Sequence, residues 1–388
     1  MNSLPLGRSS FEAIRLRQAV YVDKTSWIAR LAPSRAMVFL ARPSLFGKSL
    51  LVSTFESLFR HGLKDFAGLD IEKHWKDRTY PVVRLNFSAL RVFRSAEQFK
   101  ESFNSLISYA FSEVGFQYCN AERRIHFLDQ FRAWLRSLAP RSLVILIDEY
   151  DAPLTANLDK AAAFSEIRDL LSHFYAVLNE FQEKMRFLFV TGITTLGYHG
   201  ILSAFENLQD ISSNPLFGSV LGYTETEVQV YFSEYLERAA SRLGLTISTV
   251  CERLQENYGG FSFDFEGQTR VFCPWSVLNF LLYPQMGFLN YWELNGGQPT
   301  ALIQYVINRA KSFPISVSQT KAVRLSELST ACRFDEMSLE ALLTQTGYLT
   351  IKEVTTNQYA VLGYPNQEVA LSMAHFYAGR RSPLFQKC

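Results

Sequence analysis

The stretch RPSLFGKS at residues 42–49 lies between an apolar run, MVFLA at 37–41, and a helix-like pattern, LLVSTF at 50–55. A strand that turns tightly into a helix directs backbone N–H groups and the helix N-terminus toward one point, and an anionic triphosphate suits that point. We therefore interpret this stretch as a phosphate-binding loop. The residues expected to contact the nucleotide are Arg42, Phe46, Gly47, Lys48, Ser49 and Leu50.

Two side chains of the loop carry specific chemistry. Lys48 would reach the β and γ phosphates, and the Ser49 hydroxyl would ligate Mg²⁺. The pattern GxxxxGK(S/T) has Gly where this chain has Arg42, so the match is incomplete. Pro43 fixes its own φ and removes a donor, which would give the loop rigidity by another route. We hypothesise that Arg42 lies near the phosphates and adds charge; the alternative is that it points to solvent.

A second motif, LVILIDE at 143–149, places two adjacent carboxylates at the end of a continuously apolar strand. Carboxylates in such a place are costly without a cation or hydrogen-bond donors. In a nucleotide hydrolase the first acid holds the Mg²⁺ shell and the second polarises the attacking water. We assign Asp148 to Mg²⁺ and Glu149 to the water. The alternative is that the two acids only cap the next helix.

A third strand, at 187–192, suggests further candidates. A polar residue that ends a strand beside the acid-bearing strand can hydrogen-bond to the γ-phosphate or to the lytic water. Thr191 is therefore the candidate sensor and Thr194 the alternative, although these hydroxyls could equally satisfy a turn. An arginine that stabilises transition-state charge would also serve catalysis. Arg168 and Arg186 are among the candidates, and nothing in the sequence selects one.

Strand-length apolar runs alternate with helix-period segments along the first part of the chain, which predicts an α/β fold with a parallel sheet and helices on both faces. The runs are 37–41, 81–87, 143–147 and 187–192. The pattern then becomes helical, with Thr224 as an N-cap and helices expected at 225–243 and 247–258. Near the end, two short helices and a hairpin at 348–351 and 358–362 suggest a winged helix. The expected domains are 1–223 (α/β), 224–312 (helical, lid-like) and 313–363 (winged-helix-like).

Composition excludes several classes of protein. The 388 residues carry a net charge of +2 and are 48% hydrophobic, enough for ordinary cores but without a general basic field for nucleic acid. The apolar runs are too short to cross a bilayer, and the N-terminus lacks the pattern of a secretory signal. The five cysteines form no CxxC pair. We expect a cytoplasmic protein with no membrane partner.

Six segments taken together resemble the bacterial AAA-ATPase-like family of P-loop NTPases, whose members often carry a C-terminal PD-(D/E)XK nuclease-like domain. They are YVDKT at 21–25, RPSLFGKS at 42–49, LIDEYDAP at 146–153, VTGITTLGYHGILSAFENLQDIS at 190–212, CPWSVLNF at 273–280 and YPNQEV at 364–369. The resemblance implies a fold close to AAA+ and STAND ATPases, with ATP and Mg²⁺ as cofactors. The family loop typically reads RPRRFGKS, which makes Arg42 a family trait, whereas Ser44 and Leu45 replace two basic residues.

The resemblance implies further positions. Tyr21 to Lys24 are expected near the base or at the domain edge. Gly259-Gly260 with Cys273-Pro274-Trp275 looks like a sensor-2 region, in which a helix N-terminus closes over the nucleotide. Residues 364–388 are expected to be a remnant of the junction to the nuclease-like domain. They are too short for a nuclease, so we expect no nuclease activity and a shortened product.

The leading prediction is an ATP-binding protein with slow Mg²⁺-dependent hydrolysis, acting as a conformational switch through closure of its later domains over the nucleotide. A second interpretation is a winged-helix regulator of DNA or protein with a vestigial ATPase site. The basic residues that could serve DNA are few: Lys321, Arg324, Arg333 and Lys352. A role as a protein–protein spacer is therefore favoured over DNA binding. A third, a small-molecule kinase, fits less well because Asp148-Glu149 suits water activation. A protein partner or self-association stays open.

Overall fold

The candidate site is built on a five-stranded parallel sheet with the strand order β2-β3-β4-β1-β5. Its strands are β1 (Met37–Ala41), β2 (Val82–Asn86), β3 (Leu143–Asp148), β4 (Met185–Gly192) and β5 (Leu208–Asp210). The computed structural model describes residues 1–33, 37–119, 126–195, 201–202, 205, 207–294, 320–329 and 337–380. The sheet confirms the predicted α/β class.

Strands β1, β3 and β4 are buried along their whole length, as expected of parallel strands covered on both faces. β4 lies between the other two, with Leu40 opposite Thr191 and Ile147 opposite Val190. The carboxyl ends of parallel strands meet at one edge of a sheet. The end of β1, where the phosphate loop begins, and the end of β3, which carries Asp148, therefore share that edge with one strand between them.

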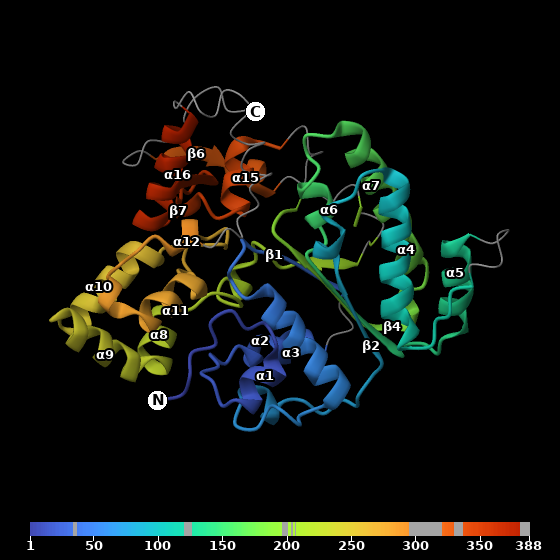
Figure 1. The fold of residues 1–388 in the computed structure, drawn as a ribbon, viewed down its shortest axis with the longest axis horizontal. Helices are drawn as coiled ribbons and strands as arrows, with labels where there is room; N and C mark the ends of the chain where they lie inside the picture. The colour runs from blue at the N-terminus through green and yellow to red at the C-terminus, as the bar shows by residue number, and fades with distance from the viewer. Residues whose placement is uncertain are drawn as a thin grey trace.

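Helices cover both faces of the sheet (Figure 1). They are α1 (Phe11–Leu16), α2 (Thr25–Leu31), α3 (Lys48–His61), α4 (Ala96–Ser112), α5 (Phe127–Ser137), α6 (Ala152–Thr155) and α7 (Ala161–Glu180), with the 3-10 turns η1 (Asp70–Lys73), η2 (Phe87–Leu90), η3 (Gln182–Lys184) and η4 (Pro215–Phe217). Val38 and Leu40 of β1 belong to the core beneath α3, whereas Phe39 belongs to the core beneath α4 and α7. Alternate residues of one strand thus serve two cores.

A group of helices with a core of its own follows β5. It begins with a capping box between Thr224 and Glu227, which confirms the predicted N-cap. The helix expected at 225–243 is wrong in extent, because the chain breaks at Phe232, whereas the helix at 247–258 is confirmed. The elements are α8 (Glu225–Tyr231), α9 (Ser233–Leu243), α10 (Ile247–Tyr258), α11 (Pro274–Leu282), η5 (Pro284–Met286) and α12 (Tyr291–Leu294).

The last part of the chain forms a three-stranded antiparallel sheet in the order β6-β8-β7. Its elements are β6 (Lys321–Arg324), α14 (Leu325–Ser329), α15 (Leu339–Gln345), β7 (Thr350–Val354), β8 (Tyr359–Gly363) and α16 (Gln367–Arg380). The predicted hairpin is confirmed as β7 and β8. Residues 313–319, 330–336 and 381–388 of the expected C-terminal domains, Arg333 among them, lie outside the described residues.

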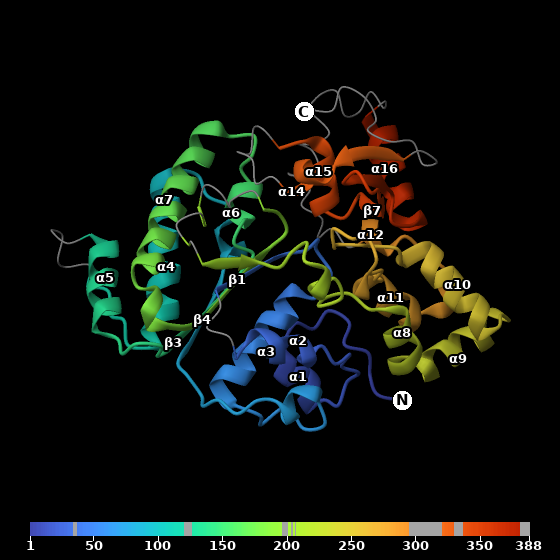
Figure 2. The ribbon, with the colours of Figure 1, turned by 180° about the vertical axis from the view of Figure 1, so that it is seen from behind.

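The C-terminal elements and the helices α8–α11 lie on one side of the molecule, with α4, α5 and α7 on the other (Figures 1 and 2). Hydrogen bonds join the C-terminal elements to those helices: Asn366 Nδ2 donates to the Gly259 carbonyl at 2.8 Å, and the Ser276 hydroxyl donates to the Glu368 carboxylate at 2.9 Å. Within the described ranges, no helix combines the length and the apolar character needed to span a bilayer.

Candidate functional site

A cavity of about 430 Å³ opens at the N-terminus of α3. Its walls come from the N-terminal segment, the phosphate loop, the carboxyl edge of the sheet and the first turn of α11. Lys48, Ser49 and Glu149, from two distant motifs, line it together. The other expected nucleotide contacts that line it are Phe46, Gly47 and Leu50.

The phosphate loop contains two residues with left-handed backbone, Leu45 with a φ of +73° and Gly47 with a φ of +96°. Gly47 is the N-cap of α3, so a side chain there would strain the turn that starts the helix. Non-glycine residues in this region, such as Leu45, concentrate at functional sites. The first N–H groups of α3 have no partner within the helix and lie at the cavity, where they would suit an anion.

Lys48 is folded back onto its own loop. Its ammonium donates to the carbonyls of Arg42, at 3.0 Å, and Pro43, at 2.9 Å. Burial lowers the pKa of Lys48, while the neighbouring Asp148 and Glu149 oppose that shift. A phosphate would replace these neutral acceptors with a charged one, and charge-assisted hydrogen bonds are the stronger kind.

Asp148 is completely buried at the end of β3. Neither of its carboxylate oxygens has a hydrogen-bond partner among the described residues. Burying an unpaired carboxylate is costly, so an orphaned buried acid calls for a cation or a donor that the protein alone does not supply. Asp148 does not line the cavity, but the next residue, Glu149, does. A divalent cation held by Asp148 would therefore lie between this carboxylate and the phosphate loop.

Glu149 follows β3 with a φ of +51°, and its side chain is 26% exposed. Its carboxylate accepts a hydrogen bond from the guanidinium of Arg91, which comes directly after η2. Both residues line the cavity. The carboxylate that the sequence assigns to the attacking water is thus held by an ion pair at the cavity wall.

The two candidate sensor residues have their hydroxyls bonded within the protein. The Thr191 hydroxyl donates to the Leu40 carbonyl of β1 at 2.6 Å, and the Thr194 hydroxyl donates to the Asp151 carboxylate at 2.7 Å. Both threonines are fully buried, and neither lines the cavity. These contacts match the alternative interpretation, in which the two hydroxyls form hydrogen bonds within the protein rather than with a nucleotide.

Arg42 does not reach the cavity. Its guanidinium donates to the carbonyls of Ala41, Ser212 and Phe217. It also lies over the ring of Phe263, 4.6 Å from the centroid. Burial lowers the pKa of Arg42 to about 9. The alternative that Arg42 points to solvent is wrong, because the residue is buried. Its guanidinium donates to backbone beneath the loop and does not line the cavity. Proximity of Arg42 to the phosphates stays a prediction.

Sequence reasoning missed Asp151, two residues after Glu149. Its carboxylate accepts hydrogen bonds from the backbone N–H groups of Ile193, at 3.2 Å, and Thr194, at 2.8 Å. Burial raises the pKa of Asp151. A Cβ at Gly192 would come within 2.4 Å of this carboxylate, so only glycine fits there. Asp151 thus ties the end of β4 to the segment that follows the acids of β3.

The segment YVDKT contributes to the cavity through Tyr21, Val22 and Lys24. The Lys24 ammonium is 2.7 Å from the Glu227 carboxylate, and so joins the N-terminal segment to α8. Asp23 instead accepts from the backbone N–H of Thr25 at 2.8 Å, which starts α2. Three of the four residues expected near the base therefore lie at the cavity, and contact with a base stays a prediction.

The sensor-2-like region divides into two parts. Pro274 and Trp275, in the first turn of α11, line the cavity. Gly259 and Gly260 do not; Gly260 has a φ of +80°, and a Cβ on it would come within 2.4 Å of the Pro365 carbonyl. The two glycines therefore serve the contact with the C-terminal part of the chain.

The arginines named from the sequence lie elsewhere, and two others line the cavity. Arg186 forms an ion pair with Asp77 at 2.7 Å, and Arg168 pairs with its neighbour Asp169 at 2.9 Å. Among the described residues the cavity is lined instead by Arg8 and Arg91. Arg8 lies in the irregular segment before α1, and Arg91 follows η2. Such segments have no periodic pattern from which their distance to the loop could be predicted.

Comparison with known proteins matches residues 5–202 to the family described as "Predicted AAA-ATPase". An uncharacterized protein from the vnfD 5′ region of Azotobacter chroococcum mcd 1 is 31% identical over 376 residues, which cover 95% of this chain and 69% of that protein. The family match spans the phosphate loop, Asp148 and Glu149 at the end of β3, and the end of β4.

Proposed function

We propose that this chain, which belongs to the predicted AAA-ATPase family, binds ATP with Mg²⁺ in the cavity beside Lys48 and hydrolyses it slowly as a conformational switch. One observation carries the proposal: the buried, unpartnered carboxylate of Asp148 lies at the same sheet edge as the phosphate loop. Lys48 and Glu149 line one cavity there. A phosphate-binding turn and an acid in need of a cation together favour a magnesium nucleotide.

Ser49 and Asp148 would hold the magnesium ion. No cluster of three His, Cys, Asp or Glu side chains able to hold a metal occurs within the described ranges, so a nucleotide's own phosphate oxygens would complete the shell. When bound, Mg²⁺ would neutralise charge on the phosphates. The N–H groups of the first turn of α3 and the Lys48 ammonium would bind phosphate oxygens and orient them.

Glu149 would accept a proton from the attacking water. In the described structure Arg91 holds this carboxylate, so the base is available only after the guanidinium exchanges it for another anion. A γ-phosphate is such an anion, and arginine binds phosphate oxygens well. The exchange would couple arrival of the nucleotide to release of the base.

The switch proposal is supported by a chain of aromatic contacts from the loop to the C-terminal part. The ring of Phe46 lies 4.9 Å from that of Phe261, which lies 5.5 Å from Trp292. The ring of Trp292 in turn lies 5.9 Å from Tyr348. Packed side chains move together, so a change in the loop on nucleotide binding would reach the β6-β8-β7 sheet.

The order β6-α14-α15-β7-β8 supports a winged-helix-like arrangement for this part, but its basic residues do not favour nucleic acid. Lys321 is paired with Glu340 of α15, and Lys352 donates to the Pro365 carbonyl. Gln345, at the end of α15, accepts from the backbone N–H of Thr195 at 3.0 Å. We therefore infer that α15 is engaged by the ATPase part and that the module is a spacer within the switch.

The experiment compares Lys48→Ala and Glu149→Gln with the wild type in ATP binding and phosphate release. Lys48→Ala removes the phosphate ligand, and we expect affinity to fall on the order of a hundredfold. Glu149→Gln keeps the binding groups and removes the base, so it should bind ATP and release no phosphate. Lys64→Ala, at an exposed lysine outside the cavity, is the matched control.

Unchanged phosphate release in both variants would overturn the proposal. The same assay separates hydrolysis from the kinase interpretation, because a kinase transfers phosphate to an acceptor and releases little of it free.

A further inference from the structure

Among the described residues, four cationic side chains line the cavity: Arg8, Lys24, Lys48 and Arg91. Lys24 and Arg91 form ion pairs, and Lys48 donates to loop carbonyls. The side chain of Arg8 forms no hydrogen bond or ion pair with any described residue. A half-buried cation without a partner at a cavity wall is available to an anionic ligand.

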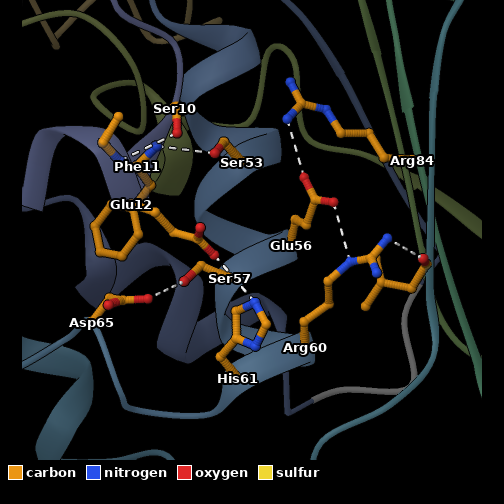
Figure 3. A network of polar contacts seen from close by, with 12 residues as sticks. Ser10, Phe11, Glu12, Ser53, Glu56, Ser57, Arg60, His61, Asp65 and Arg84 are labelled. Carbon is orange, nitrogen blue, oxygen red and sulfur yellow. Dashed lines mark hydrogen bonds and ion pairs between the residues drawn. The ribbon is translucent and has the colours of Figure 1, made fainter. Parts of the chain in front are cut away.

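Arg8 precedes α1, and α1 docks on α3 (Figure 3). The backbone N–H of Phe11 donates to the Ser53 hydroxyl at 3.0 Å, and Glu12 lies 3.2 Å from the ring nitrogen of His61. The segment before α1 turns back on itself, with the Arg8 N–H donating to the Pro5 carbonyl at 3.1 Å. Arg8 therefore lies two residues before the N-cap of α1, in the segment that this docking holds beside α3.

Helix α3 separates Arg8 from Glu149. Ser53 faces α1, whereas Phe55, two residues on and so on the opposite side of the helix, packs against Phe187 of β4 with ring centroids 5.1 Å apart. Glu149 comes from the sheet side. Arg8, which precedes α1, and Glu149, which follows β3, thus line the cavity at the N-terminus of α3 from its two sides.

We propose that Arg8 binds the α- and β-phosphates of the nucleotide, on the side of α3 opposite Glu149. This inference rests on the proposed function, in which the γ-phosphate lies at Glu149. A phosphate chain that runs across the N-terminus of α3 then presents its inner phosphates toward Arg8. The planar guanidinium offers several donors to such oxygens. Arg8 belongs to the same chain as the loop, so no second subunit is needed to supply it.

The test measures the affinities of ATP and of ADP for the full-length chain by calorimetry, in the wild type, Arg8→Ala and Arg8→Lys. Because both nucleotides share the inner phosphates, Arg8→Ala should weaken ATP and ADP equally, by roughly tenfold to a hundredfold. Arg8→Lys should restore part of the loss and increase the salt dependence relative to Arg8→Ala. Arg17→Ala, at an exposed arginine that ends α1 and does not line the cavity, should bind as the wild type does.

Three results would overturn the inference: Arg8→Ala that binds both nucleotides normally, a loss confined to ATP, or a loss that Arg17→Ala reproduces. A thermal melt of the nucleotide-free Arg8→Ala variant tests for a merely structural role of Arg8. An unchanged melting midpoint excludes that role. A lowered midpoint with unchanged ADP affinity shows that Arg8 is structural and overturns the inference. If the wild type binds neither nucleotide, the proposed function fails first. If Lys48→Ala loses binding and Arg8→Ala does not, only this inference fails.

Discussion

Asp148 is a residue whose burial lowers stability and whose carboxylate is the proposed ligand of a cation. Its carboxylate is buried, and no described residue donates to it. Such an arrangement is expected to destabilise the protein without ligand, because the buried carboxylate accepts no hydrogen bond and, among the described residues, has only the nearby charge of Lys48 to offset it. Arrangements that lower stability in this way concentrate at functional sites, as expected if Asp148 binds a cation in the proposed function.

The variant Asp148→Asn tests this interpretation. Loss of the charge should raise the melting midpoint of the nucleotide-free protein, and loss of the anionic ligand should weaken Mg²⁺-dependent ATP binding roughly 10- to 100-fold. Thermal denaturation and calorimetry with Mg²⁺ or with EDTA measure the two effects. A lowered midpoint together with unchanged affinity for MgATP would show that the carboxylate is structural.

At the scale of elements, α11 and α16 are joined by a buried acid. Glu368, in the first turn of α16, accepts from the Ser276 hydroxyl of α11 at 2.9 Å and from the Trp292 N–H of α12 at 2.7 Å. Burial raises the pKa of Glu368 to about 8. The groups that face it also include Cys273, Tyr258 and Tyr291. Because Trp275 follows Cys273 and lines the cavity, this junction supports one wall of the site.

This acid makes stability depend on pH. Between its ordinary pKa and about 8, folded Glu368 keeps a proton that the unfolded chain has lost, so stability is full at low pH and falls as pH rises through that window. A difference of one in pKa between the folded and unfolded chain corresponds to about 1.4 kcal/mol. Glu368→Gln, which does not titrate, should flatten this fall in denaturation curves measured from pH 5 to 9. Parallel pH profiles for the two proteins would contradict the assignment.

The elements also show what the sequence could and could not predict. Continuous apolar runs and the acids at 148 and 149 were enough to predict a parallel sheet and the edge where its site lies, because strand burial and strand direction leave few alternatives. Side-chain directions were not predictable: Arg42 turned inward and Thr191 bonded to Leu40, and both depend on neighbours brought by the fold. Arg8 and Arg91 were missed because irregular segments have no periodicity to read.

At the scale of the whole molecule, the phosphate loop is in contact with the C-terminal part. Gly347, after α15, has a φ of +83°, and a Cβ on it would lie 2.9 Å from the ring of Pro43. Pro43 is also the residue whose carbonyl holds the Lys48 ammonium. A displacement at Gly347 would therefore shift Pro43 and, through its carbonyl, the ammonium of Lys48, the proposed phosphate-binding group.

Substituting Gly347 by Ala tests this contact, with Gly287→Ala as a matched control. Both glycines have positive φ, so backbone strain alone should cost each variant about 1 to 2 kcal/mol of stability. Gly347 has neighbours within 3 Å of the added Cβ, whereas Gly287 has none within 4 Å. We expect Gly347→Ala alone to weaken ATP binding, as measured by calorimetry below both melting midpoints. Equal ATP affinity in the two variants would show that the contact between Gly347 and Pro43 does not affect nucleotide binding.

The central claim is that a magnesium nucleotide occupies the cavity beside Lys48. The most direct test is a crystal structure of the chain with Mg²⁺ and a non-hydrolysable ATP analogue. We expect phosphates at the N-terminus of α3, Mg²⁺ between Ser49 and Asp148, and Arg91 released from Glu149. A nucleotide bound outside this cavity, or a cavity left empty at saturating analogue with Lys48 still on the carbonyls of Arg42 and Pro43, would contradict the claim.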